Sequence, residues 1–264
     1  MYKEKVLDVC QKCAKEAQEV GCKKWVELST AQVYSPPKKG HCDENAKLEP
    51  WTKLATYKLQ AEEFLKTTNL NVTILRAAII YGPGDTAGLA PRIIVGAVYK
   101  KLNEKQKNLW TKDLGLATVH VDDVCAAMWA AREFENGSIY NLADQGNTDQ
   151  GTINEMLEQV LGIKTGFVGS VLSSAAKAIG LKGVAEEAND KHLKPWSDLC
   201  KEQGITSTPL SPYIDQELLY NNSLSVDGSA IEKKGFKYTH PKLVKEDLRV
   251  IMEYFGNQGL FPKV

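Results

Sequence analysis

Two spacings of apolar residues organise the first part of the chain, one typical of helices and one typical of strands. Apolar positions recur every three to four residues over 3–20 and over 51–68, which predicts two amphipathic helices. Gly21 directly follows the first of these segments, where a glycine commonly ends a helix. Each helix is therefore expected to pack one apolar face against the rest of the protein.

Short runs rich in β-branched and apolar residues lie between and after these helices. They cover 24–29, 71–75, 117–121 and 138–142, and a further helix is predicted from 122 to about 134. Helix and strand thus alternate, an order typical of a parallel sheet with helices on both faces. The predicted fold class is α/β, a Rossmann-like doubly wound parallel sheet.

The strand signal weakens after residue 150. A helix is predicted at 152–161, a small-residue segment follows over 170–183, and a last helix runs from about 243 to 255. This pattern indicates a smaller, mostly helical lobe. The predicted domain boundaries are 1–150 for the Rossmann-like part and 151–264 for the C-terminal lobe.

Composition limits the classes of function. Hydrophobic residues make up 43% of the 264 positions, enough for a sizeable core, and 33 basic residues balance 33 acidic ones. Because no net charge attracts polyanions, nucleic acid is not expected as a partner. The sequence shows no signal peptide and no apolar run of roughly 18 residues, so a reducing, cytoplasmic location without a membrane span is expected. Cys10 and Cys13 form a CxxC without a second ligand pair nearby, and no metal site is predicted.

Five local sequences stand in a fixed order along the chain. A hydroxyl-rich turn ends the first strand, a lysine and a glutamate lie four positions apart on the next helix, and a Gly-Pro-Gly-Asp turn follows the next strand. The five segments are 28–35 (LSTAQVYS), 58–62 (KLQAE), 75–85 (LRAAIIYGPGD), 120–124 (HVDDV) and 140–142 (YNL). Together they resemble the extended short-chain dehydrogenase/reductase (extended SDR) family, which includes NAD-dependent epimerases and dehydratases and relatives of 3β-hydroxysteroid dehydrogenase.

The resemblance implies a nicotinamide cofactor, NAD(P), and assigns roles to particular positions. Thr30 matches the hydroxyl that orients the substrate, and Lys58 matches the lysine that binds the nicotinamide ribose. Arg76, Ala77 and Ile79 match the segment beside the cofactor. The residues leave other roles open: Thr30 as a strand-end hydroxyl bonded to backbone, Lys58 as a solvated helix residue, and Arg76 as a structural arginine.

The segment 120–124 is expected to be structural. The ring of His120 is expected to bond to loop backbone. Asp122 and Asp123 are expected to cap the following helix and to complement its dipole. None of the three receives a catalytic role.

One position departs from the family's pattern of catalytic residues. The family's acid/base tyrosine stands four residues before the lysine on the same helix face, and counting back from Lys58 gives Leu54. A leucine has no proton to exchange. Tyr57 is adjacent to Lys58 but about 100° round the helix, and it is expected to pack on the helix instead of replacing the missing group.

A second departure concerns the phosphate-binding turn. The family's Gly-rich strand-to-helix turn does not occur in the sequence, so NAD(P) binding lacks its main anchor. Roughly two to three βα units are expected to be missing before the first helix. The strand at 25–28 should then present an apolar edge that a protein partner or self-association covers, or the sequence is a truncated isoform or gene model.

These departures leave three hypotheses about function. The first is a catalytically inactive extended SDR protein that acts as a binding or scaffold subunit through the sheet edge and the first helix. The alternative is an NAD(P)-dependent epimerase/dehydratase or hydroxysteroid dehydrogenase-like oxidoreductase whose N-terminal half is absent from this sequence. A third is a sensor that binds NADP without turnover. Leu54 favours the first, and the sequence of the C-terminal lobe does not reveal a substrate.

Overall fold

The computed structural model describes residues 2–264 and shows an α/β protein with parallel strand pairs. The predicted fold class is therefore confirmed. The residues form two compact units, each drawn from several stretches of chain. Unit 1 holds the chain up to Ala78 with Ala117–Asn147 and Ser223–Pro241, and unit 2 holds Ile79–Leu116, Thr148–Asn222 and Lys242–Val264.

These units differ from the two contiguous domains predicted at 1–150 and 151–264. The chain changes unit close to the predicted boundary, after Asn147. However, the segment Ile79–Leu116 belongs to unit 2, and Ser223–Pro241 returns to unit 1. Each unit is thus completed by chain that lies far away in sequence.

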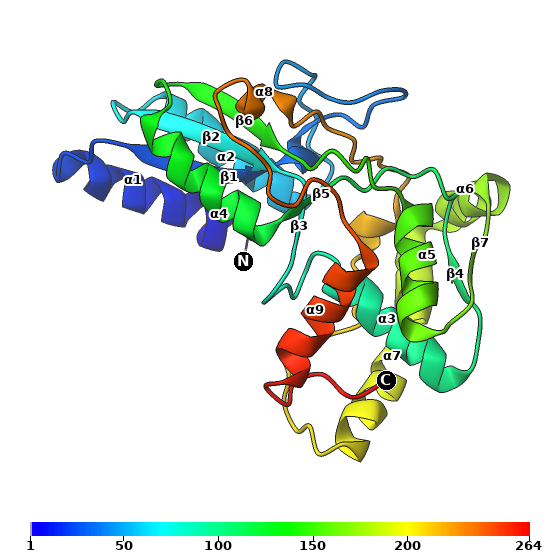
Figure 1. Ribbon diagram of the computed structural model, residues 1–264. Helices are drawn as coiled ribbons and strands as arrows, with labels where there is room; N and C mark the ends of the chain where they lie inside the picture. The colour runs from blue at the N-terminus through cyan, green and yellow to red at the C-terminus, as the bar shows by residue number, and fades with distance from the viewer. Residues whose placement is uncertain (1) are drawn as a thin grey trace. The chain divides into compact units, whose positions relative to one another are not determined.

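Three parallel strands form the sheet of unit 1, in the order β1 (Trp25–Thr30), β2 (Val72–Ala77) and β6 (Ser138–Leu142). Figure 1 shows the three strands side by side. The central strand β2 is buried at every position. Within residues 2–264, β1 pairs with β2 alone, and its Val26 and Leu28 are only half-buried.

Helices cover this sheet. The first helix of the chain begins as a π-helix, η1 (Lys3–Asp8), and continues as α1 (Val9–Glu19). It packs with α2 (Lys53–Lys66) against the sheet through one apolar cluster. The cluster consists of Leu7, Cys10, Ala14, Ala61, Leu65, Leu70, Val72 and Ile74. Because the same faces are apolar in sequence, both helices were predictable from their spacing.

The remaining elements of unit 1 are short. They are η2 (Ala31–Val33), β5 (Thr118–His120), α4 (Val121–Ala130), η3 (Ala131–Glu133) and α8 (Ser229–Glu232). η3 continues α4 and packs against β1. The Thr52 hydroxyl accepts a hydrogen bond from the Ala55 N–H at 3.1 Å, and this N-cap sets where α2 begins.

Unit 2 is mostly helical around its own core. Four helices enclose it: α3 (Ala90–Leu102), α5 (Gln150–Leu161), α7 (Leu181–Glu202) and α9 (Lys245–Gly256). The smaller elements are β3 (Ile79–Tyr81), β4 (Gln106–Asn108), β7 (Thr165–Phe167), α6 (Ser170–Ile179) and η4 (Gln216–Leu219). β4 and β7 pair in parallel. Among the described helices, none combines the length and apolar character that crossing a bilayer requires.

Candidate functional site

A buried polar network in unit 1 draws one side chain from each of four of the sequence motifs. Glu62 comes from α2, Arg76 from β2, Tyr34 from the turn after η2, and Asn141 from β6. All four are buried. We call these residues, with Ser29 of β1, the Arg76 network.

Arg76 is the centre of this network. Its Nη2 donates to Glu62 Oε2 at 2.6 Å and its Nε donates to both Glu62 oxygens at 3.2 Å. Its Nη1 donates to the Tyr34 hydroxyl at 2.9 Å, which in turn donates to Asn141 Oδ1 at 2.8 Å. The Ser29 hydroxyl donates to Glu62 Oε1. The network therefore connects all three strands of the sheet to α2.

The charges of the network compensate one another. Burial opposes the charge on Arg76, but the hydrogen bonds and charge of Glu62 raise the Arg76 pKa above its ordinary value. Burial raises the pKa of Tyr34 to about 12, so this phenol keeps its proton and continues to donate. Buried ion pairs are strongly destabilised when one partner alone is removed. Arg76, predicted to lie beside the cofactor, thus has its hydrogen bonds directed inside unit 1.

Lys58 lies one turn before Glu62 and points to β1. Its Nζ donates to the Leu28 carbonyl at 2.7 Å and to Glu27 Oε1 at 3.0 Å. The Trp25 indole N–H donates to the second oxygen of the same carboxylate at 3.2 Å. The side chains of Lys58 and Glu27 are 26% and 11% exposed, so the ammonium is held in a largely desolvated ion pair.

The family's acid/base tyrosine stands one helix turn before the lysine. At that position this chain carries no group that exchanges protons. Leu54 stands there, 38% exposed. Tyr57 is half-buried and packs against the apolar cluster of η1, α1 and α2. The structure thus places Tyr57 in a packing position one residue from Lys58, on another face of the helix.

Two more of the predicted site residues lie at the end of the parallel sheet. Thr30 ends β1, and its hydroxyl accepts a hydrogen bond from the Gln32 N–H at 3.2 Å as the cap of η2. Ala77 ends β2 directly opposite Thr30. Because Lys58 binds the Leu28 carbonyl, Thr30, Lys58 and Ala77 lie at the same end of the sheet. Ile79 begins β3 and belongs to unit 2.

Hydride transfer at a nicotinamide is the chemistry that the resemblance implies for these residues. That chemistry needs a hydroxyl with a tuned pKa beside the lysine, and the adjacent turn of α2 offers a leucine side chain. The lysine that would bind the ribose is already bound to a carboxylate and a carbonyl. Thr30 donates no hydrogen bond toward Lys58 in the described structure, and its oxygen caps η2.

The start of α4 shows that one sequence prediction was wrong. The N-cap is His120 and not Asp122, because His120 Nδ1 accepts from the Asp122 N–H at 3.2 Å. Asp122 and Asp123 occupy the first turn, where their charge suits the helix dipole. Asp123 is buried, and its carboxylate accepts from the N–H of Thr239 at 2.7 Å and of His240 at 2.9 Å. Asp123 therefore fixes the segment 239–240 to α4.

The Gly-Pro-Gly-Asp turn has its own structural explanation in unit 2. Gly82 and Gly84 adopt positive φ values of 129° and 84°, which side-chain-bearing residues avoid. The Asp85 carboxylate then accepts four backbone N–H groups, of residues 87 to 90, at 2.6–3.1 Å. The turn thus ends in a carboxylate that satisfies the N–H groups of the residues leading into α3 and of its first residue, Ala90.

Four residues of the site had no role predicted from the sequence: Glu27, Tyr34, Glu62 and Asn141. Three of them were visible as letters of the motifs, but their partners lie 14 to 107 positions away along the chain. In the sequence, Glu27 is recognisable only as an acidic residue within an apolar strand, which does not indicate a role. Only the folded chain shows that it neutralises Lys58.

The parallel sheet, its flanking helices and the Arg76 network define a Rossmann-like α/β protein. The family model described as "NAD dependent epimerase/dehydratase family" matches residues 1–143, more than half of the chain. The chain belongs to this family. No curated protein matches its sequence significantly.

Solved structures of extended SDR enzymes share this fold. A UDP-N-acetylglucosamine 4-epimerase from Methanobrevibacter ruminantium M1 is 16% identical with a TM-score of 0.66, and the match covers 97% of this chain and 70% of that one. The dTDP-glucose 4,6-dehydratase DesIV from Streptomyces venezuelae is 19% identical with a TM-score of 0.65, covering 98% of this chain and 68% of that one. The described chain thus spans about two thirds of the length of these enzymes.

Proposed function

We propose that this chain is a family member that does not catalyse hydride transfer and that acts as a binding subunit. The observation that supports inactivity concerns two residues on neighbouring turns of α2, Leu54 and Lys58. Leu54 stands where the family has its proton donor, and the Nζ of Lys58 is held by Glu27 and Leu28. The cytoplasmic location expected from the sequence is part of this proposal.

A turnover assay tests inactivity. The purified chain is mixed with NADH or NADPH and with nucleotide sugars or ketones, and nucleotide oxidation is followed by absorbance. We expect nucleotide oxidation to be as slow as in the protein-free solution, because the Leu54 side chain cannot donate a proton. A protein-dependent rate would refute the proposal.

The surface that we propose for binding is the outer edge of β1. This strand has one neighbour within residues 2–264, and an open edge presents N–H and C=O groups that another strand can pair with. The adjoining Val26 and Leu28 are half-buried apolar side chains that an added strand or helix would cover. A second copy of the chain or a strand of another polypeptide would satisfy both features.

Light scattering over a range of protein concentrations tests this surface. We expect association that is weakened in Val26→Lys and Leu28→Lys, because a charge on that face opposes burial. Val20→Lys is the matched control, since Val20 is an exposed valine at the end of α1. Two results together would argue against self-association through this edge. The protein would be a monomer at all concentrations, and the β1 amides would exchange no faster in the lysine variants than in the wild type.

A cofactor-dependent function is the second candidate. Structures similar in fold were determined with NAD, such as MoeE5 in complex with UDP-glucuronic acid and NAD. The chain keeps Thr30 and Lys58 at one end of its sheet. A longer polypeptide that supplies a phosphate-binding turn would be an NAD(P)-dependent oxidoreductase or a sensor. Calorimetric titration with NAD(P)(H) tests this, and saturable heat that disappears in Lys58→Ala would favour it.

A further inference from the structure

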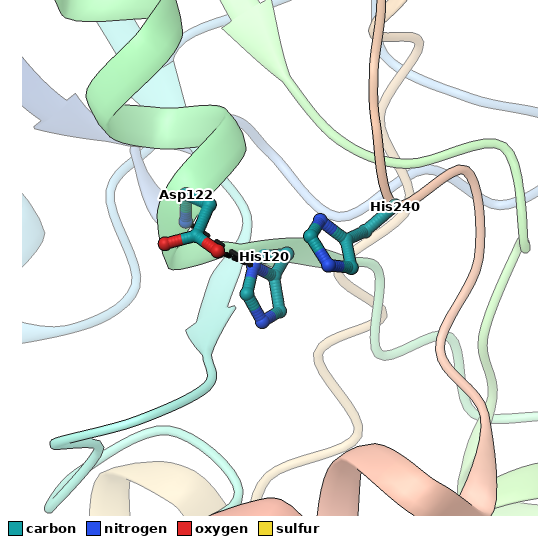
Figure 2. A group of neighbouring side chains, drawn as sticks. All are labelled: His120, Asp122 and His240. Carbon is teal, nitrogen blue, oxygen red and sulfur yellow. Dashed lines mark hydrogen bonds and ion pairs between the residues drawn. The ribbon is translucent and has the colours of Figure 1, made fainter.

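Two imidazoles and a carboxylate meet at the start of α4, all within unit 1 (Figure 2). One nitrogen of His120, one nitrogen of His240 and one carboxylate oxygen of Asp122 all lie within 4.8 Å of one another. The two imidazole rings stack, with centroids 3.7 Å apart and planes inclined by 20°. Asp122 Oδ2 lies 3.6 Å from His120 Nδ1. These three residues are called the His–Asp–His cluster below.

We propose that the His–Asp–His cluster is a binding site for a divalent transition-metal ion of the Zn²⁺ type. Imidazole nitrogen and carboxylate oxygen are the ligands that Zn²⁺, Co²⁺ and Ni²⁺ accept together. Ligands about 2.0–2.2 Å from a tetrahedral ion lie roughly 3.3–3.6 Å from each other. The ligand atoms, at most 4.8 Å apart, must thus approach one another by about 1.5 Å or less, and the stacked rings must also separate.

The exposed members of the cluster provide this movement. The side chains of Asp122 and His240 are 70% and 36% exposed, so both can rotate without disturbing a core. His120 is buried as the N-cap of α4 and supplies a fixed first ligand. Rotation of His240 about its side-chain bonds opens the ring stack and admits the ion. Water completes the coordination from the solvent side.

The hydrogen bonds around His240 prepare one of its nitrogens for a metal. The Thr239 hydroxyl donates its single proton to Asp123 Oδ1 at 2.7 Å, because a carboxylate only accepts. The same hydroxyl oxygen lies 3.1 Å from His240 Nδ1 and must therefore accept the Nδ1 proton. This tautomer leaves the lone pair on Nε2. Metal-binding histidines commonly carry such a partner on the other nitrogen, which orients the ring.

His120 also has a lone pair on the side of Asp122. Its Nδ1 accepts the Asp122 N–H in a single hydrogen bond of 3.2 Å, near the upper limit for N–H donors. An ion bound through His120 Nδ1, with Asp122 and His240 as the other ligands, would take the place of this bond. It would tie the start of α4 to the segment 239–240, beside the contacts that Asp123 already makes. The site is thus a structural cross-link and does not depend on any enzymatic activity.

Titration of the intact chain with Zn²⁺ tests the site by calorimetry and by thermal unfolding. We expect one equivalent to bind and the melting temperature to rise with Zn²⁺ concentration, because the ion binds the folded state. His120→Asn, Asp122→Asn and His240→Gln should each weaken binding about tenfold or more. Asparagine is a favourable N-cap, so His120→Asn keeps α4 while it removes the ligand. His41→Gln is the matched control, since His41 is an exposed histidine outside the cluster.

Exposed thiols are the competing ligands, and Co²⁺ distinguishes them. Cys13, Cys22 and Cys125 are exposed and could bind the same ions. At the proposed site Co²⁺ should show its visible ligand-field bands without a thiolate charge-transfer band, and alkylation of the thiols should leave binding unchanged. The proposal is overturned if no equivalent binds below about 1 mM Zn²⁺, if the three ligand variants bind as the control does, or if alkylation abolishes binding.

Discussion

Arg76 and Glu62 form an ion pair in which the guanidinium is 1% exposed and the carboxylate 0%, with Nη2 and Oε2 2.6 Å apart. This pair fixes the rotation of α2 relative to β2. Lys58, one turn earlier, is fixed in the same way by Glu27. Bringing Tyr57 to the position of Leu54 would require turning α2 by about 60° and shifting it by about 4.5 Å along its axis, which would break both pairs. The fold therefore holds a leucine at the position of the family's proton donor.

Removing one partner of the buried pair should lower the free energy of unfolding more than removing both. Arg76→Met leaves the Glu62 carboxylate buried without compensation, and we expect the free energy of unfolding to fall by about 3–5 kcal/mol. Adding Glu62→Leu should recover part of this loss, because the uncompensated charge is gone. Urea denaturation of the two single variants and the double variant measures the coupling. Losses that simply add would show that the two side chains are not a stabilising pair.

Neighbouring aspartates at the start of α4 should differ sharply in their effect on stability. Asp123→Ala leaves the N–H groups of Thr239 and His240 without their acceptor, at an expected cost of about 2–3 kcal/mol. Asp122→Ala removes only an exposed first-turn charge, at a cost under about 1 kcal/mol. Hydrogen exchange should show faster exchange at residues 239–240 in the first variant alone. Equal exchange in the two variants would rule out the proposed tie between α4 and this segment.

The stability of unit 2 should depend on pH through His192. The ring packs edge-on against Tyr99 on α3 with centroids 5.5 Å apart, and neither ring nitrogen has a hydrogen-bond partner among the described residues. Burial, followed by the charge of Lys191, lowers the pKa of His192 from 6.5 to about 4. Between these values the unfolded chain binds a proton that the folded chain does not, so stability falls as pH falls.

The variant His192→Phe isolates this contribution. Wild-type protein should lose about 2–3 kcal/mol more than the variant between pH 7 and pH 4, since each pKa unit corresponds to about 1.4 kcal/mol. Unfolding in urea at a series of pH values measures the difference, with His41→Leu as the exposed-histidine control. Parallel curves for wild type and His192→Phe would mean that His192 does not titrate below its ordinary range.

Several elements with one apolar and one polar face were predictable from the sequence, as was the buried strand β2, whereas two helices of unit 2 were missed. The continuous helix of η1 and α1, the helix α2 and the strand β6 lie within two residues of their predicted bounds because their faces differ in polarity. The helix α3 was missed because its middle, from Ile93 to Val98, is buried all round and shows no period. The helix α7 was missed because it contains Gly183 and Pro195, residues that disfavour helices.

The site was predictable in its positions but not in its interactions. The motifs identified Thr30, Lys58 and Arg76, yet their partners are set by contacts between distant segments, such as Lys58 with Glu27. The N-cap of α4 was misassigned because aspartate is the commoner cap, whereas here the ring nitrogen of His120 takes that role. The two discontinuous units likewise depend on long-range contacts that no local pattern encodes.

The central proposal is that this chain does not transfer hydride, because α2 carries Leu54 in place of a proton donor one turn before Lys58. Its most direct test is transfer of deuterium from NADH labelled at C4 to a ketone or a nucleotide-sugar substrate, with the product analysed by mass spectrometry and Lys58→Ala run in parallel. Wild-type protein and Lys58→Ala should both yield no more deuterated product than the protein-free sample. Deuterated product that forms with wild-type protein and is lost in Lys58→Ala would contradict the claim.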